Sequence, residues 1–117
     1  MKAISKITAM TLFFLSAAAL YGHPPDSLQL GLDSAGTVFS VKVFHPVKNP
    51  ANHFIINIAV KVNGTEAVLQ TYRGQFDKMV QEAVYMLINL KPLDKIEVTG
   101  VCSITGKKTA VFTAPEK

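Results

Sequence analysis

FIINIAVKVNGTEAVLQTY, residues 54–72, contains two runs rich in β-branched side chains on either side of Asn63-Gly64. Ile, Val and Thr favour strands because their branched side chains pack well on a pleated surface. An Asn-Gly pair tolerates the positive φ angles of a two-residue hairpin turn and is the strongest short-range signal for a β-hairpin. The sequence therefore predicts an antiparallel pair of strands joined at Asn63-Gly64.

The chain on both sides of this hairpin is also β-rich, with apolar residues recurring at every second position. That period is typical of half-buried strands. Residues 73–82 instead carry apolar side chains at helical spacing, which predicts a loop or a single helical turn. A break in the alternation after Gly100 predicts a β-bulge. Beside the hairpin, the predicted strands are 27–32, 37–44, 84–90, 95–103 and 109–113.

Seven short strands with regularly spaced turn signals are typical of a β-sandwich. The expected fold class is therefore all-β, an immunoglobulin-like antiparallel sandwich. Residues 1–22 have the layout of a secretory signal peptide, with Lys2 and Lys6 before an apolar run and small residues after it. That run is short for a transmembrane helix. We expect residues 23–117 to form one exported domain, periplasmic or extracellular, without a stable membrane anchor after cleavage; an uncleaved N-terminal anchor is the alternative.

The charge of the chain argues against a nucleic-acid partner. The net charge is +4, and removal of the two leader lysines leaves +2, spread along the remaining residues. Nucleic-acid-binding domains are usually far more basic and gather their cations on one face. The sequence also lacks a glycine-rich phosphate loop and a serine nucleophile elbow. These observations exclude several common enzyme and binding classes.

The chain contains three histidines and one cysteine, and these are His23, His45, His53 and Cys102. Imidazole and thiolate are common ligands for zinc, copper and iron. All four residues fall at predicted strand ends or in loops that can meet at one end of a sandwich. The alternatives are turn or capping roles for the histidines. Cys102 lacks an intramolecular disulfide partner, so a buried inert thiol, a reactive thiol, an intermolecular disulfide and metal ligation all remain open.

Four short pieces occur in order along the mature chain: residues 23–25 (HPP), 45–46 (HP), 53–58 (HFIINI) and 102–106 (CSITG). Together they resemble the iron-binding domain of the superoxide reductase family, which includes neelaredoxin and desulfoferrodoxin. The resemblance implies an immunoglobulin-like sandwich with a non-haem Fe2+/Fe3+ site that reduces superoxide to hydrogen peroxide by one electron. It also implies that His23, His45 and His53 are equatorial ligands and that Cys102 is the axial ligand.

One family ligand has no counterpart, because Thr105 stands where the family places a fourth histidine. Thr105 thus marks a vacant ligand position or a residue just behind the ligands. Three imidazoles and one thiolate also match a tetrahedral zinc site, and copper is a further option. Enzyme activity therefore stays open beside two alternatives, a copper or zinc carrier without catalysis and a metal-free interaction domain. Superoxide or a metal ion would be the small partner, the electron donor is unknown, and a homo-oligomer is allowed.

Overall fold

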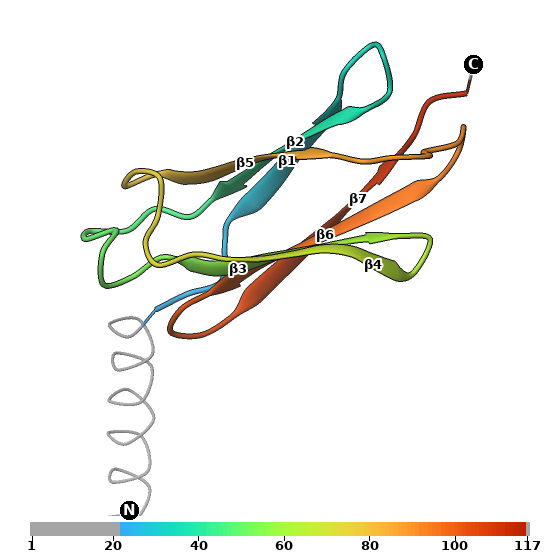
Figure 1. Ribbon diagram of the computed structural model, residues 1–117. Helices are drawn as coiled ribbons and strands as arrows, with labels where there is room; N and C mark the ends of the chain where they lie inside the picture. The colour runs from blue at the N-terminus through green and yellow to red at the C-terminus, as the bar shows by residue number, and fades with distance from the viewer. Residues whose placement is uncertain (1–21, 117) are drawn as a thin grey trace, which may run out of the picture.

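Residues 22–116 are the part of the chain that the computed structural model describes, and they form seven strands without a helix (Figure 1). The predicted signal peptide lies outside these residues except for Gly22. None of the described segments forms an apolar helix of membrane-spanning length. The strands are β1 (Ser27–Leu32), β2 (Val38–Phe44), β3 (Ile55–Val62), β4 (Thr65–Thr71), β5 (Val80–Met86), β6 (Lys95–Cys102) and β7 (Lys107–Thr113).

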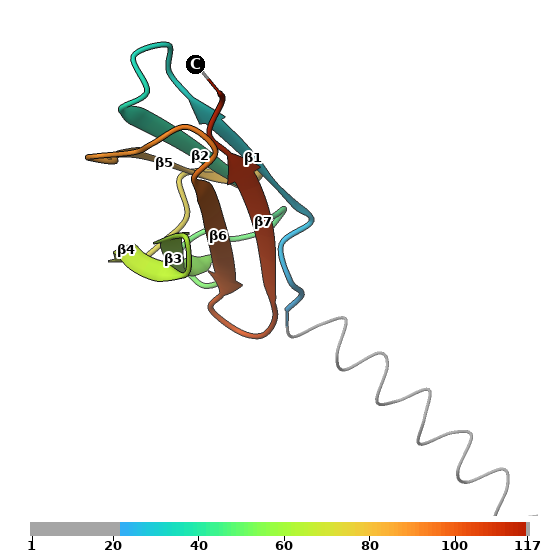
Figure 2. The ribbon, with the colours of Figure 1, turned by 90° about the vertical axis from the view of Figure 1, so that its right-hand side faces the viewer.

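The strands form two antiparallel sheets that face each other as two layers (Figure 2). One sheet has the order β1-β2-β5 and the other the order β4-β3-β6-β7. Every neighbouring pair is antiparallel. The structure thus confirms the predicted all-β class and the antiparallel β-sandwich.

The core lies between the two layers and consists of side chains at alternate positions of the central strands. Residues at every second position of a strand face the same side, so one face of each strand is buried. Burial of a Val, Ile or Phe side chain contributes roughly 1.5–3 kcal/mol. The fully buried members are Phe39, Val41 and Val43 of β2, Ile55, Ile58 and Val60 of β3, and Ile96 and Val98 of β6.

The predicted hairpin at Asn63-Gly64 is confirmed, since the two residues have φ angles of 49° and 86°. Asn63 also ties this turn to the start of β6. Its side-chain oxygen accepts the Lys95 N–H, and its amide donates to Asp94 at 2.8 Å. The hairpin therefore fixes the register of β3, which begins two residues after His53.

The prediction for residues 73–90 is right in one respect and wrong in another. Of its two alternatives, the loop is confirmed for residues 73–79, which contain no helical turn, but β5 begins at Val80, four residues before the predicted start. Asp77 instead closes a tight turn, because its carboxylate accepts the N–H groups of Met79 and Val80, each at 2.8 Å. The helically spaced Phe76 and Met79 are largely exposed, so their spacing does not reflect core packing.

The predicted bulge after Gly100 is also misplaced. β6 alternates regularly through Cys102, and the register shift lies in the opposite strand, between Ile55 and Asn57. Gly100 serves packing between the sheets, since a Cβ there would lie 3.0 Å from a methyl group of Val43. The bulge in β3 adjusts the strand end that leads back to His53.

Candidate metal centre

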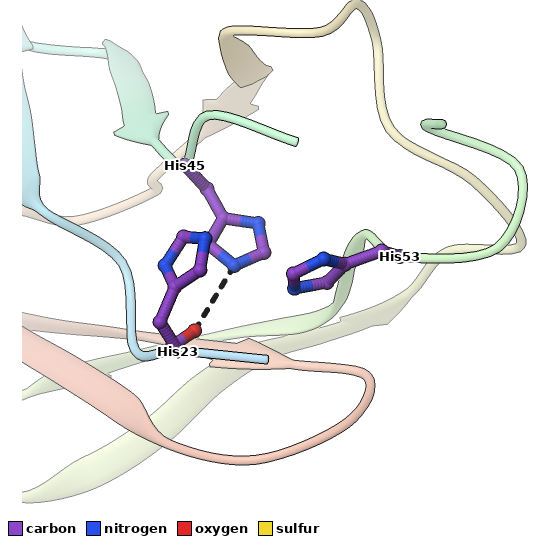
Figure 3. A group of neighbouring side chains, drawn as sticks. All are labelled: His23, His45 and His53. Carbon is purple, nitrogen blue, oxygen red and sulfur yellow. Dashed lines mark hydrogen bonds between the residues drawn. The ribbon is translucent and has the colours of Figure 1, made fainter. Parts of the chain in front are cut away.

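The three histidines meet at one end of the sandwich. His45 follows β2, His53 precedes β3 and His23 precedes β1. One ring nitrogen from each lies within 4.8 Å of the others. The ring centroids are 4.6 Å apart for His23 and His45, 4.8 Å for His45 and His53, and 5.1 Å for His23 and His53. Figure 3 shows the three rings gathered around a common space. This group can hold a metal ion.

Cys102 adjoins the histidines at the end of β6. Its thiol is buried, and Sγ lies 3.3 Å from Nε2 of His53. Sγ also accepts the Ile104 N–H at 3.4 Å. Among the described residues, the three histidines form the group whose ligand atoms all lie close to one another. Cys102 contacts this group through His53. All four predicted ligands therefore lie at the same end of the molecule.

His45 is fully buried and is held through both its backbone and its ring. Its N–H donates to the Met79 carbonyl at 2.9 Å. The Gln75 amide donates to the His45 carbonyl at 2.7 Å, and the Gln75 Oε1 lies 2.9 Å from the His45 Nδ1. The other ring nitrogen, Nε2, lies 3.1 Å from the carbonyl oxygen of His23 (Figure 3). The segment before β5 therefore sets the orientation of this ring.

His23 is half-buried, and both of its ring nitrogens lie beside backbone carbonyl oxygens. Nδ1 is 2.9 Å from the Pro24 oxygen, and Nε2 is 3.0 Å from the Pro46 oxygen. A neutral imidazole has a single N–H, whereas a carbonyl oxygen only accepts hydrogen bonds. One nitrogen of the neutral ring therefore faces an oxygen without a proton between them. A metal cation at that nitrogen would remove this repulsion.

The turn between β6 and β7 supports the segment that carries His23. Gly106 has a φ of +91°, and a Cβ there would lie 2.8 Å from the backbone of Pro24. A Cβ at Gly22 would lie 2.8 Å from Ile104 and 3.5 Å from the methyl group of Thr105. Thr105 is exposed and sits beside Gly22, one residue from His23. It is therefore a neighbour of the segment that carries a candidate ligand.

The surroundings of His53 favour the neutral ring that a metal needs. Burial lowers the pKa of His53 below its usual 6.5, and the nearby charges of His45 and His23 lower the pKa further. Because its pKa is lowered, the His53 ring is neutral at a lower pH than an ordinary histidine, and it can offer its lone pair to a metal there. Burial and the other two histidines thus disfavour protonation of the ring that also contacts Cys102.

A surface hollow opens onto the site from solvent. It is lined by His23 and His53 together with Pro46, Lys48, Asn49 and Asn52 of the loop between β2 and β3. Two hydrogen bonds fix the conformation of this loop, because the backbone oxygen of Asn49 accepts the N–H groups of Asn52 and His53. The loop between His45 and His53 therefore forms a wall of the entrance.

Gln75 is the functional candidate whose role the sequence did not indicate. Its place in an irregular segment allowed it to line a pocket or to lie on the surface, and nothing marked it as a partner of a histidine. In the structure Gln75 is buried, and its side chain bonds only to backbone and to a candidate ligand. Comparisons with known proteins add no assignment, since no family model and no curated protein matches the chain.

Proposed function

We propose that this protein binds a transition-metal ion through His23, His45, His53 and Cys102, and that the ion is iron. The observation that carries the proposal is the convergence of every imidazole and the only thiol of the chain at one end of the sandwich. These residues are far apart in sequence and come from four different strand ends. A cluster of this composition, with His45 and Cys102 buried and His45 held by hydrogen bonds, matches the layout of a metal centre.

The donor chemistry fits iron in a redox role. Imidazole nitrogens and a thiolate both ligate iron, and a thiolate increases the electron density on the metal. Bound iron would supply the single electron that, with two protons, converts superoxide to hydrogen peroxide. His45 and His53 would hold the metal from the ends of β2 and β3, and Cys102, which lies beside His53, would add the thiolate. The half-buried His23 and His53 would be the ligands on the solvent side.

The hollow beside His23 and His53 suits a small anionic substrate. It reaches the ligands from solvent, and Lys48 stands on its wall. A cation at the entrance of a cleft raises the local concentration of an anion and speeds its association. In an exported protein the electrons would come from a donor outside the cytoplasm. The proposed activity is therefore superoxide reduction, with Lys48 as an attracting charge.

A copper or zinc carrier without catalysis is the second candidate. The number of donors favours it, because three imidazoles and one thiolate complete a tetrahedral zinc site and leave no open position. The position of Thr105 beside Gly22 adds no fourth imidazole. The choice between the two candidates thus depends on which metal the site prefers. A chain that binds no metal would be an interaction domain.

The first test is metal binding by the mature protein, purified without a histidine tag. The metal-free protein is titrated under argon with Fe2+, Cu+ and Zn2+ in separate experiments. Bound metal is measured by inductively coupled plasma mass spectrometry. We expect one equivalent of iron, lost in His45→Ala and His53→Ala and retained in the exposed β1 variant Gln29→Ala. Exclusive binding of copper or zinc would support the carrier, and absence of all three metals would support an interaction domain.

The second test separates metal binding from catalysis. Superoxide is supplied to the iron-loaded, pre-reduced protein, and the decay of superoxide and the yield of hydrogen peroxide are followed together. Superoxide reduction forms one peroxide for each superoxide consumed and releases no oxygen. Lys48→Gln should slow the reaction, with an effect that shrinks as salt rises. Iron-loaded protein with no activity above that of free iron would reject the reductase and leave the metal site standing.

A further inference from the structure

Gln75 has three side-chain hydrogen bonds, and two of them fix the orientation of its amide. Nε2 lies 2.7 Å from the His45 carbonyl oxygen and 2.9 Å from the Asp77 carbonyl oxygen. Both oxygens only accept hydrogen bonds, so the amide NH2 must point toward them. The reverse orientation would place Oε1 against two carbonyl oxygens. Oε1 therefore faces the ring of His45.

This orientation determines which nitrogen of His45 carries the proton. Oε1 lies 2.9 Å from Nδ1 and can only accept, so Nδ1 must donate. In the neutral ring the lone pair then belongs to Nε2, which is the nitrogen on the side of His23 (Figure 3). We propose that Gln75 is a positioning residue that fixes Nε2 of His45 as the metal-binding atom; this inference rests on the proposed metal site.

The His23 carbonyl is a competing acceptor, because it lies 3.1 Å from Nε2. Gln75 is the stronger partner for two reasons. Its contact is shorter, and its amide is itself buried and held by two further bonds, whereas His23 is half-buried. With the proton on Nδ1, the lone pair of Nε2 and the His23 oxygen face each other. A cation between them turns this repulsion into attraction.

The backbone around Gln75 makes it a firm support. Its N–H donates to the Pro50 carbonyl at 3.0 Å, which joins the segment to the loop between His45 and His53. Partners that orient a metal-bound histidine through its second nitrogen typically contribute about 10-fold to 100-fold in metal affinity.

Gln81 provides a matched control. It is a second buried glutamine in the same region, and its side chain bonds to the Phe76 N–H and the Glu82 carbonyl. Gln81→Leu removes comparable buried hydrogen bonds without touching a histidine. Gln75→Leu removes the acceptor for Nδ1. Gln75→Glu, a carboxylate at the pH of the measurement, keeps an acceptor for Nδ1 but loses both N–H donors to the carbonyl oxygens.

The decisive measurement is the tautomer of His45 in metal-free protein with 15N-labelled histidine, at about pH 8.5, well above the ordinary histidine pKa. Two-bond 1H–15N correlations should show a protonated Nδ1 and an unprotonated Nε2 in the wild type and in Gln81→Leu. Gln75→Leu should lose this pattern and bind Zn2+ about 10-fold to 100-fold more weakly. Gln75→Glu should restore part of both properties.

Two results would overturn the inference. One is a wild-type His45 whose Nδ1 lacks a proton, and this result does not depend on whether any variant folds. The other is a Gln75→Leu protein with the wild-type tautomer and wild-type zinc affinity. A wild type that has the expected tautomer but binds no zinc instead overturns the proposed metal site, while the control of the His45 tautomer by Gln75 stands.

Discussion

The thiol of Cys102 and the ring of His53 lie side by side, with 3.3 Å between Sγ and Nε2. The two residues belong to paired strands, since Cys102 pairs with Ile55 at the start of β3. The β3 bulge follows directly at Ile56, and the Phe54 N–H is held by the Ser103 hydroxyl at 3.1 Å. The end of the β3–β6 pair therefore brings together an imidazole and a thiol that are 49 residues apart.

Substitution of Cys102 by serine should remove the absorption band that a metal-bound thiolate produces. With Co2+ as the probe, we expect the wild type to show a near-ultraviolet band from charge transfer between thiolate and cobalt. Cys102→Ser should bind cobalt more weakly and lack the band, since the chain has no other cysteine. The measurement is an absorption titration under reducing conditions. A wild-type cobalt complex without the band would show that the thiol is not a ligand.

His45 and His23 should differ in what they contribute to folding. His45→Ala leaves the buried Gln75 Oε1 without a donor, and an unsatisfied buried polar group costs about 1–3 kcal/mol. His23 is half-buried and precedes the first strand, so His23→Ala should lower the free energy of unfolding by less than about 1 kcal/mol. Urea unfolding of the metal-free proteins measures both values.

Both histidine variants should nevertheless lose metal affinity, because each removes one ring from the triad. Titration with Zn2+ in the same buffer provides this comparison. Equal unfolding free energies for the two variants would contradict the clamped role of His45. Wild-type zinc affinity in His23→Ala would instead remove His23 from the ligand set.

The sequence predicts much of the fold because local chemistry determines it. Asn63-Gly64 has the positive φ angles that its residue types allow, and the alternating apolar residues of β2 and β6 form the core. The order of strands in the two sheets depends on long-range pairing, which periodicity along the chain does not encode. The start of β5 was missed because the Asp77 turn depends on side-chain hydrogen bonds, whereas the spacing of Phe76 and Met79 indicated a helix.

The candidate ligands were visible in the sequence because the chain has so few residues of these types. Their supports were not visible. Gln75 contacts His45, which is 30 positions away in the sequence, and Gly106 in the β6–β7 turn packs against Pro24. Such contacts arise only after the sheets have assembled. Residue type therefore identified what can bind a metal, and tertiary packing identified what orients it.

Acid should weaken the turn between β1 and β2 through Asp33. Its carboxylate accepts the N–H groups of Val38 and Thr37, each at 2.9 Å, and these bonds lower the pKa of Asp33 below 3.8. A carboxyl whose pKa is lowered in the folded state stabilises the fold above its unfolded pKa and loses that contribution as pH falls through the folded value. The stability advantage over Asp33→Asn should therefore be full near neutral pH.

That advantage should shrink as the pH falls below about 4. Urea unfolding of the wild type and Asp33→Asn between neutral pH and about pH 2.5 measures it. Asn keeps a side-chain oxygen that can accept the same bonds, so the comparison isolates the charge. A difference that stays constant over this range would show that the carboxylate charge does not stabilise the turn.

Substitution of Gly106 by alanine should weaken metal binding through a clash with Pro24, which the same substitution at Gly36 avoids. Gly106 and Gly36 both have positive φ, at +91° and +77°, so alanine at either position should cost roughly 1 kcal/mol of folding stability. A Cβ at Gly106 would also lie 2.8 Å from the Pro24 backbone, whereas a Cβ at Gly36 meets nothing within 4 Å. Gly106→Ala must therefore displace the segment that carries His23.

We expect Gly106→Ala to bind Zn2+ at least about tenfold more weakly than the wild type, as for other groups that orient a ligand. Gly36→Ala should bind zinc as the wild type does, although its positive φ also lowers its unfolding free energy. Zinc titration and urea unfolding of both variants provide the comparison. Wild-type zinc affinity in Gly106→Ala would mean that His23 can follow the displaced segment, or that the ligands from β2 and β3 suffice. His23→Ala distinguishes these explanations, because it weakens zinc binding only if His23 is a ligand.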